Sequence, residues 1–349
     1  MSDFHVLKVA SVEKLTPSSV AITFEIPDSL QDVFSFTAGQ YITIKKELNG
    51  TELRRAYSIS SSPSSGKLTV GIKKMPNGTF SVYANESISE GDLLEVMPPE
   101  GRFTFIAEAK AQNIGAFAAG SGITPIMSIA ETVLQSNDAN TFVLVFGNQT
   151  PEEAMYRKEL LQLQEKYTER FFIQWVYSRS SEPDCLFGRI ENSTVNLVLK
   201  NKYRSLDFDA FYLCGPEEMI QTVSNSLKNN NVPESNIFFE LFTSSDTEGH
   251  EVEGLEGKTE VTVVLDDEEQ SFTMNQKELV LDAVLKNDMD APYSCQGGVC
   301  SSCIARVVEG EAEMVKNQIL TDGEVAEGLI LTCQAHPKTA KLKVDYDDV

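Results

Sequence analysis

The spacing of four cysteines in the last quarter of the chain restricts what that segment can fold around. The chain holds six cysteines, and four of them follow the order C-x4-C-x2-C and then one distant cysteine: Cys295, Cys300, Cys303 and Cys333. This order is the plant-type arrangement of thiolate ligands around a 2Fe-2S cluster. Gly297 and Gly298 lie inside the loop and supply the backbone freedom that wrapping a cluster requires. The pattern therefore predicts a 2Fe-2S site.

Two other interpretations of these cysteines stay open. A structural zinc site usually pairs two C-x2-C units, whereas this segment has one, and unrelated buried cysteines are the second alternative. A Rieske centre needs two histidine ligands, and of the three histidines only His336 lies near a candidate ligand in the sequence. The crowding of cysteines favours a metal site over a disulfide framework. Because the N-terminus lacks an apolar stretch after a charged lead, we expect a protein of the reducing cytoplasm.

The formal net charge of −23 is spread unevenly along the chain. Residues 246–349 hold 23 acidic and 8 basic residues, whereas residues 1–245 hold 29 acidic and 21 basic residues. Phosphate binding needs clustered lysines and arginines, so this balance argues against a nucleic-acid partner. A basic patch on a protein partner is the favoured complement, and acidity that only aids solubility is the alternative. No run of apolar residues is long enough to predict a membrane span.

The hydrophobic pattern changes twice along the chain. Over the first hundred residues, short runs such as SVAITFEI and KLTVGIKK alternate apolar and polar positions, which predicts an antiparallel β-barrel or sandwich. Further on, apolar runs such as TFVLVFG alternate with helix-like segments at 124–136, 151–167 and 216–229, which predicts α/β units around a parallel sheet. A polar, glycine-rich stretch then predicts a linker before the cysteine-containing domain. The expected limits are 1–108, 109–242, 243–257 for the linker, and 258–349.

A glycine-rich turn follows the strand-like run IGAFAA and opens the first helix-like segment. It reads Gly120-Ser121-Gly122-Ile123-Thr124-Pro125. Glycines let a backbone approach a pyrophosphate, and a helix N-terminus favours negative charge. Pro125 suits the first turn of a helix, but it stands where G-x-G-x-x-G has its third glycine. The turn is therefore not a standard dinucleotide fingerprint.

Four short motifs in this order resemble the ferredoxin–NADP reductase superfamily over residues 1–242. They are Arg55-Ala56-Tyr57-Ser58, Gly78-Thr79-Phe80-Ser81, the glycine-rich turn, and Cys214-Gly215-Pro216. The resemblance implies that Arg55 pairs with the pyrophosphate of FAD, that Tyr57 stacks on the flavin, and that Ser58 lies near flavin N5. The second motif would donate hydrogen bonds to the same pyrophosphate. FAD is favoured over FMN. Taken by itself, the first motif predicts only a packed strand.

In the nucleotide half, the resemblance implies that Thr124 and Cys214 lie near the nicotinamide, with a buried inert thiol as the alternative for Cys214. It also implies that Phe242 covers the flavin and that Glu240 lies near the hydride path. A plain buried strand is the alternative for both. Ser178 and Arg179 follow the run FFIQWVY, where an arginine can pair with the 2′-phosphate of NADPH. NADPH is therefore favoured over NADH, unless Arg179 belongs to a solvated loop.

The cysteine segment DAPYSCQGGVCSSC, with LILTCQAHP after it, resembles the ferredoxin module of oxygenase reductases. This implies an α+β β-grasp fold with the four cysteines as metal ligands. Longer stretches, including FGNQTPEEAMYRKELLQLQEKYTER, resemble the reductase components of phenylacetyl-CoA epoxidase systems. The resemblance implies that NADPH reduces FAD, and that single electrons pass through the 2Fe-2S cluster to a diiron epoxidase subunit. Reductases of other oxygenases, hydroxylases or fatty-acyl desaturases share the layout, and a redox-sensing binding protein is the alternative from another class.

The uneven charge predicts that the ferredoxin segment docks on its electron acceptor in a salt-sensitive way. Complementary charge mainly raises the association rate, and salt screens exposed charges that lie more than about 8–10 Å apart. Raising salt from ~0.05 to ~0.5 M should therefore slow partner reduction and leave NADPH-to-flavin transfer nearly unchanged in a stopped-flow series. Partner reduction that is indifferent to salt would assign the acidity to solubility alone.

Overall fold

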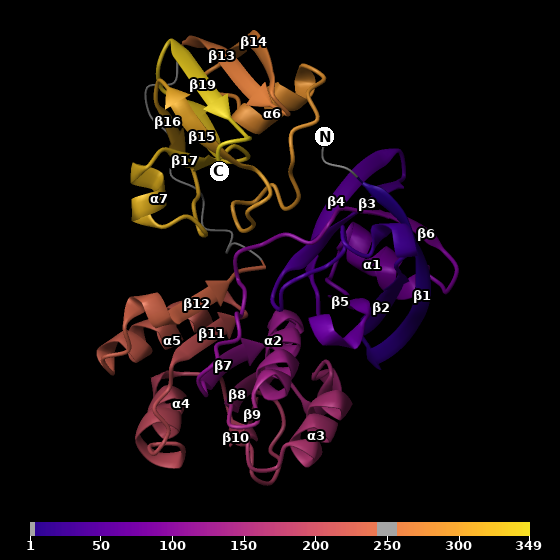
Figure 1. The fold of residues 1–349 in the computed structure, drawn as a ribbon, viewed down its shortest axis with the longest axis vertical. Coiled ribbons are helices and arrows are strands. Elements are labelled where there is room, and N and C mark those ends of the chain that lie inside the picture. Colours follow the sequence, from indigo (N-terminus) through magenta and orange to yellow (C-terminus); the bar gives the residue numbers. More distant parts are fainter. Residues whose placement is uncertain (1–3, 243–256) are drawn as a thin grey trace. The chain divides into compact units, whose positions relative to one another are not determined.

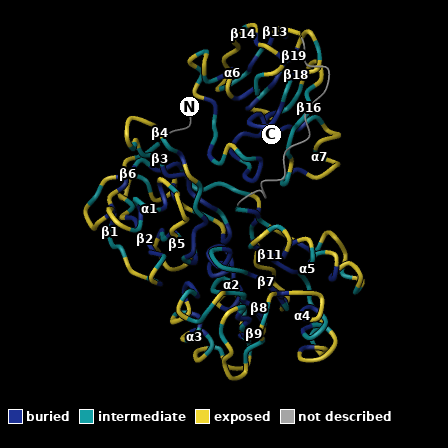
Figure 2. The backbone as a smooth tube through the Cα atoms, turned by 180° about the vertical axis from the view of Figure 1, so that it is seen from behind, coloured by how far each residue is buried: buried dark blue, intermediate teal, exposed yellow. Residues whose placement is uncertain are grey.

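The computed structural model describes residues 4–242 and 257–349. Its strands form three main sheets and one two-stranded pair (Figure 1). The chain divides into two compact units, of which the larger holds most of residues 5–242 and the smaller holds the C-terminal sheet. Each main sheet packs its own group of buried apolar side chains, seen as dark segments in Figure 2. Within the described ranges, no helix is long and apolar enough to cross a membrane.

The first sheet contains six strands in the order β4-β3-β6-β1-β2-β5. Ile59, directly after β4, bridges to Val70 on β5, so the two ends of this order meet and the sheet closes into a barrel. Ile22, Ile42 and Val70 are completely buried inside it. The strands are β1 (His5–Thr16), β2 (Ser19–Glu25), β3 (Tyr41–Leu48), β4 (Thr51–Ser58), β5 (Leu68–Lys73) and β6 (Leu93–Val96).

The second sheet is parallel throughout, in the order β10-β9-β8-β7-β11-β12. Its central strands are buried along nearly their whole length, as expected where helices cover a parallel sheet. The strands are β7 (Asn113–Ala119), β8 (Thr141–Asn148), β9 (Phe171–Tyr177), β10 (Leu186–Phe187), β11 (Ala210–Cys214) and β12 (Ile237–Glu240). The helices are α2 (Ile123–Ser136), α3 (Arg157–Lys166), α4 (Asn192–Asn196), which continues into a π-helix at Leu197–Lys202, and α5 (Glu217–Asn229).

Two segments of the first two sheets differ from the sequence-based expectation. The helix expected over 151–167 begins only at Arg157, because Tyr156 has a left-handed backbone with φ 57° and no helix passes through it. A 3-10 turn, η4 (Pro151–Glu153), precedes it. The all-strand expectation for the first hundred residues is also incomplete, since α1 (Thr79–Glu86) follows Gly78. With eight residues, this helix is too short for the apolar periodicity by which longer helices are predicted.

The C-terminal sheet is mixed, in the order β14-β13-β19-β15-β17. Strand β13 pairs parallel with β19 and antiparallel with β14, and α6 adds its apolar face to the buried core. The elements are β13 (Lys258–Leu265), β14 (Glu268–Asn275), α6 (Val280–Lys286), β15 (Ile304–Glu309), β16 (Ala312–Met314), α7 (Asp322–Ala326), β17 (Leu329–Leu331), β18 (Ala335–Pro337) and β19 (Lys341–Asp345). The three expected fold classes are confirmed. The expected linker lies outside the described residues except for residue 257, and the domain limits stay a prediction.

Candidate functional site

Three of the predicted site residues meet where the barrel contacts the parallel sheet. Ser58 is the last residue of β4, and its Oγ donates a hydrogen bond of 3.0 Å to Oε2 of Glu240. Glu240 ends β12, and Cys214 ends the neighbouring strand β11 in register with it. The carboxyl ends of parallel strands commonly hold the ligand in such sheets. The structure therefore brings the end of the flavin motif to the edge of the sheet where a nucleotide would bind.

Burial controls the charge of this group. It raises the pKa of Glu240 to about 8, and the hydrogen bond from Ser58 only partly offsets this rise. Burial also raises the pKa of the Cys214 thiol well above its usual value, and the nearby Glu240 adds to the rise. Desolvation disfavours the charged form of an acid, so both groups are mainly protonated at neutral pH. The cluster can hold a proton at Glu240 and exchange it through the Ser58 hydroxyl.

The glycine-rich turn lies directly beside Cys214. Gly120–Gly122 form the 3-10 turn η3, and α2 begins at the next residue. A side chain at Gly122 would overlap the backbone carbonyl of Cys214, so only glycine allows this approach. The buried Thr124 donates a hydrogen bond of 3.0 Å to the Ser121 carbonyl and holds the turn against the helix.

The other two residues of the Cys214 motif support the same turn. Gly215 packs against Ala119 and the side chain of Met219, and Pro216 is the N-cap residue of α5. Pro125 is buried in the first turn of α2. The structure thus brings the two predicted nucleotide motifs together at the N-terminus of a helix, where phosphate groups bind well.

The flavin motifs lie on β4 and at the start of α1. Arg55 is exposed and donates a hydrogen bond of 2.7 Å to the Arg54 carbonyl, next to the half-buried Ala56. The ring of Tyr57 lies 5.7 Å from that of Phe80. Gly78 is the N-cap residue of α1, where no side chain caps the first-turn amides. Uncapped helix amides and an arginine fit a pyrophosphate chemically.

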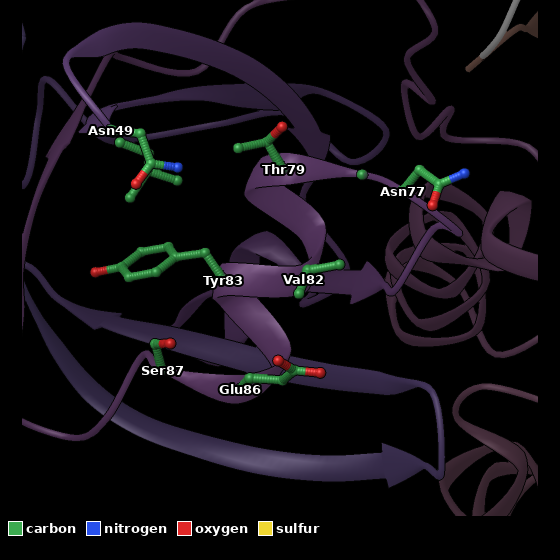
Figure 3. Close-up of a pocket in the computed structure, with 9 residues that line it drawn as sticks. Asn49, Asn77, Thr79, Val82, Tyr83, Glu86 and Ser87 are labelled. Carbon is green, nitrogen blue, oxygen red and sulfur yellow. The ribbon is translucent and has the colours of Figure 1, made fainter.

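A cavity of about 420 Å³ runs along the outer side of α1 (Figure 3). Thr79 lies at its start, and the ring of Tyr83 forms one wall. Ser81 is buried, and its Oγ accepts a hydrogen bond of 3.1 Å from the Met75 amide, which fixes the loop before the helix. The lining residues are Leu48, Asn49, Asn77, Gly78, Thr79, Val82, Tyr83, Glu86 and Ser87.

The remaining residues predicted in the nucleotide half lie at the edges of the parallel sheet. Ser178 and Arg179 directly follow β9, and their backbone amides donate to the carbonyls of Asn148 and Gln149 at 3.0 and 2.9 Å. The Arg179 side chain is exposed. Phe242 is half-buried against the apolar core of the nucleotide half. The roles of these residues stay predictions.

The four cysteines lie together in the C-terminal unit. Cys300, Cys303 and Cys333 are buried, and Cys295 is half-buried. Interaction with the Cys300 and Cys333 thiols lowers the pKa of Cys295, and interaction with Cys333 lowers the pKa of Cys303. These mutual effects place the four sulfur atoms within one group, which the sequence spacing alone could only suggest.

The loop around these sulfur atoms fits a 2Fe-2S cluster chemically. Gln296 and Gly298 have φ of 51° and 73°, which turns the loop around the thiols, and the Gly297 amide donates to Cys295 Sγ at 3.4 Å. The buried Ser294 hydroxyl has no hydrogen-bond partner among the described residues, so it is free to donate to a bound group. Within residues 4–242 and 257–349, no group of three or more His, Cys, Asp or Glu side chains has an arrangement that could hold a single metal ion. A 2Fe-2S cluster needs only two ligands on each iron.

Comparisons with known proteins agree with this arrangement. Family models for an oxidoreductase FAD-binding domain, an oxidoreductase NAD-binding domain and a 2Fe-2S iron-sulfur cluster binding domain match residues 6–105, 117–225 and 263–338. The chain is 37% identical to one subunit of the 1,2-phenylacetyl-CoA epoxidase of Escherichia coli, over 99% of both chains. This chain is an FAD- and 2Fe-2S-containing oxygenase reductase. The reductase is also 32% identical to a 3-ketosteroid-9-alpha-monooxygenase ferredoxin reductase component from Rhodococcus rhodochrous, over 98% of this chain and 96% of the other.

A solved structure shares the whole architecture of the reductase. Phthalate dioxygenase reductase superimposes with a TM-score of 0.63 at 25% identity, and the match covers 98% of both chains. The expected cofactors are confirmed as FAD, a nicotinamide nucleotide and a 2Fe-2S cluster.

Sequence reasoning missed two residues of the reductase that the structure brings to this region. Asn148 ends β8, and both polar atoms of its side chain are buried without a partner among the described residues. A buried unpaired amide at this edge of the sheet is available to a bound nucleotide. Tyr156 contacts the barrel, through Ser60. Neither residue belongs to a recognisable motif, and an isolated Asn or Tyr carries no spacing signal.

The raised pKa of Glu240 predicts a specific pH dependence of the reductase's stability. In the unfolded chain the carboxyl titrates near 4.5 and in the folded protein near 8, so the folded protein holds an extra proton between these values. The stabilisation is complete below about pH 4.5 and is lost as pH rises through about 8. Glu240→Gln stays neutral, so its Tm should rise relative to that of the wild type from about pH 5 to about pH 9.

Thermal unfolding across this pH range measures the effect, and the exposed Glu90→Gln is the matched control. A Tm difference for Glu240→Gln that stays constant with pH would show that the carboxyl is already charged in the folded protein.

Proposed function

We propose that this reductase takes hydride from NADPH and delivers electrons one at a time to the diiron subunit of a phenylacetyl-CoA epoxidase. The observation that supports the acceptor is the 37% identity to a component of such an epoxidase over nearly the whole of both chains. The observation that supports the hydride path is the hydrogen bond between Ser58 and Glu240, which joins the flavin and nucleotide halves. We also place the reaction in the cytoplasm, where thiol ligands stay reduced.

When bound, FAD would supply the conversion between two-electron and one-electron chemistry, and the 2Fe-2S cluster would supply one-electron transfer to the acceptor. We assign Arg55 and the first-turn amides at Gly78–Ser81 to the FAD pyrophosphate, and Tyr57 and Phe242 to the faces of the flavin. The cavity along α1 would take the adenosine half, with the Tyr83 ring available for stacking. This assignment favours FAD over FMN because FMN has no group to fill the cavity. Cys295, Cys300, Cys303 and Cys333 would hold the two irons.

The neutral state of Glu240 and Cys214 suits the chemistry of hydride transfer. A hydride would bring negative charge to a bound flavin, and a charged carboxylate at Glu240 would oppose that transfer electrostatically. Burial keeps both groups protonated at neutral pH. The Ser58 hydroxyl, which lies between Glu240 and the flavin site in this assignment, can pass a proton in either direction. Gly120, Gly122 and Thr124 would position the nicotinamide end of the nucleotide.

A second acceptor is supported by a separate observation. The 32% identity to a ketosteroid monooxygenase reductase component extends over 98% of the chain, and the modules of the two reductases have the same order. The alternative proposal is therefore a reductase for another oxygenase, hydroxylase or desaturase. A non-catalytic redox sensor would not need the hydrogen-bonded Ser58–Glu240 pair where the barrel contacts the parallel sheet.

Reconstitution tests the proposal directly. The purified reductase should support NADPH-dependent epoxidation of phenylacetyl-CoA by the oxygenase subunits of the epoxidase. Cys300→Ser should abolish this coupling and leave flavin reduction by NADPH intact, because the cysteines lie in one compact unit and Ser58, Gly122 and Cys214 lie in the other. Flavin reduction without epoxidation by the wild type would point to another acceptor. Loss of flavin reduction in a folded Cys300→Ser variant would contradict the modular transfer of electrons.

The exposed Arg179 carries the proposed preference for NADPH. A charge-assisted hydrogen bond is worth about 1.5–3 kcal/mol, so Arg179→Ala should lower kcat/KM for NADPH about tenfold or more. The value for NADH should change little, since NADH has no 2′-phosphate. Steady-state kinetics with both nucleotides measure the ratio, with Arg204→Ala on the same domain surface as the control. An unchanged ratio would assign Arg179 to the solvated surface.

A further inference from the structure

The barrel and the parallel sheet belong to one compact unit and meet through the loop that follows Ser58. This loop, residues 59–66, is rich in serine and turns toward α2 and the segment before α3. The Ser61 carbonyl accepts a hydrogen bond of 2.7 Å from Ser128, and Ser64 donates to Gln135 at 2.5 Å. The Ser60 hydroxyl lies 2.7 Å from that of Tyr156. At this loop, the barrel and the parallel-sheet half are therefore joined by hydrogen bonds as well as by apolar packing.

Tyr156 makes the most buried of these contacts. Its side chain is 6% exposed although the residue lies in a connection between two elements. Its left-handed backbone, with φ 57°, delays the start of α3 and directs the ring inward. A non-glycine residue in this conformation carries a steric cost. The surrounding structure must offset that cost, and burial of the ring together with its hydrogen bond does so.

The direction of the hydrogen bond follows from the number of protons. The Ser60 hydroxyl has one proton, which it donates to the Thr69 carbonyl at 3.1 Å. The Tyr156 hydroxyl is therefore the donor to Ser60 Oγ. Burial raises the pKa of Tyr156 well above its usual value, so this donor keeps its proton. Replacing either side chain leaves a buried polar atom of the other without its partner, which costs free energy.

The Tyr156 ring and the side chain of Thr124 both lie against Gly71 of the barrel strand β5. Gly71 on β5 has no side chain, and a Cβ there would lie 2.7 Å from Thr124 Cγ2 and 2.8 Å from the Tyr156 hydroxyl. Thr124 and Tyr156 thus pack side by side on one strand of the barrel. Ser60 is two residues from Ser58, the residue assigned to flavin N5. The hydrogen bond from Tyr156 to Ser60 therefore joins the loop after Ser58 to a ring that lies beside Thr124, the residue assigned to the nicotinamide.

We propose that the hydrogen bond from Tyr156 to Ser60 is a positioning contact that sets the separation of the nicotinamide and flavin rings for hydride transfer. The inference rests on the proposed hydride path at Ser58. Tyr156 acts through Ser60 and Thr124 and touches neither cofactor in this assignment. Hydride transfer depends steeply on the approach of the reacting atoms, so a small displacement lowers the rate more than it lowers binding.

Tyr156→Phe keeps the ring and removes the donor, and Ser60→Ala removes the acceptor. Each should lower the rate of flavin reduction at saturating NADPH by roughly threefold to tenfold, and the double variant should be no slower than the slower single variant. The KM for NADPH and the FAD content should stay at wild-type values. The long-wavelength charge-transfer absorbance between nicotinamide and flavin, which reports ring stacking, should weaken in parallel. The later transfer of electrons from flavin to the cluster should be unchanged.

Ser64→Ala is the matched control, because it removes a hydroxyl of the same loop whose bond to Gln135 is exposed. In the Ser64→Ala variant, NADPH should reduce the flavin at the wild-type rate. Wild-type rates and wild-type charge-transfer absorbance in both Tyr156→Phe and Ser60→Ala would overturn the inference. A fall in the rate that is matched by a rise in the KM for NADPH would also overturn it. The same holds if the rate losses of the two single variants multiply in the double variant. A wild-type protein whose flavin NADPH does not reduce would instead overturn the proposed function.

Discussion

The contact between the end of β4 and the carboxyl ends of β11 and β12 is the constraint on which the redox site depends. It requires a barrel strand to finish at the edge of a separate parallel sheet, and the hydrogen bond from Ser58 to Glu240 marks the meeting point. Close approach of the glycine-rich turn is possible only because Gly122 has no side chain against the Cys214 carbonyl. The end of the first flavin motif therefore meets the sheet edge that carries the nucleotide motifs, an arrangement that neither sheet could form alone.

Charge is distributed in opposite ways inside and outside the molecule. At the junction of barrel and sheet, burial keeps Glu240 and Cys214 protonated, so the site around the hydride path carries little charge of its own. The C-terminal hundred residues instead carry most of the net negative charge. A low internal charge suits the arrival of hydride, and a strong surface charge suits recognition of a separate protein.

The fold classes and cofactors could be predicted from sequence because their signals are local. The cysteine spacing, the RxYS segment and the glycine-rich turn each place the required groups within a few residues of one another. Predictions failed where the signal was weak or the backbone unusual. Helix α1 has only eight residues, too few for a clear periodicity, and the left-handed Tyr156 shortened the helix expected from residue 151. The roles of the predicted site residues, Arg179 and Phe242 among them, remain predictions.

The chemical groups and the order of the modules that carry them follow from the amino-acid sequence. Cysteines at the plant-type spacing, and glycines at the start of a helix, can be recognised from a few neighbouring residues. Which distant groups meet, and in which protonation state, depends on the folded structure. Ser58 and Glu240 are 182 positions apart, and Ser60 and Tyr156 are 96 positions apart. Their protonation and hydrogen bonds depend on burial, and burial is a property of the folded chain and not of any local motif.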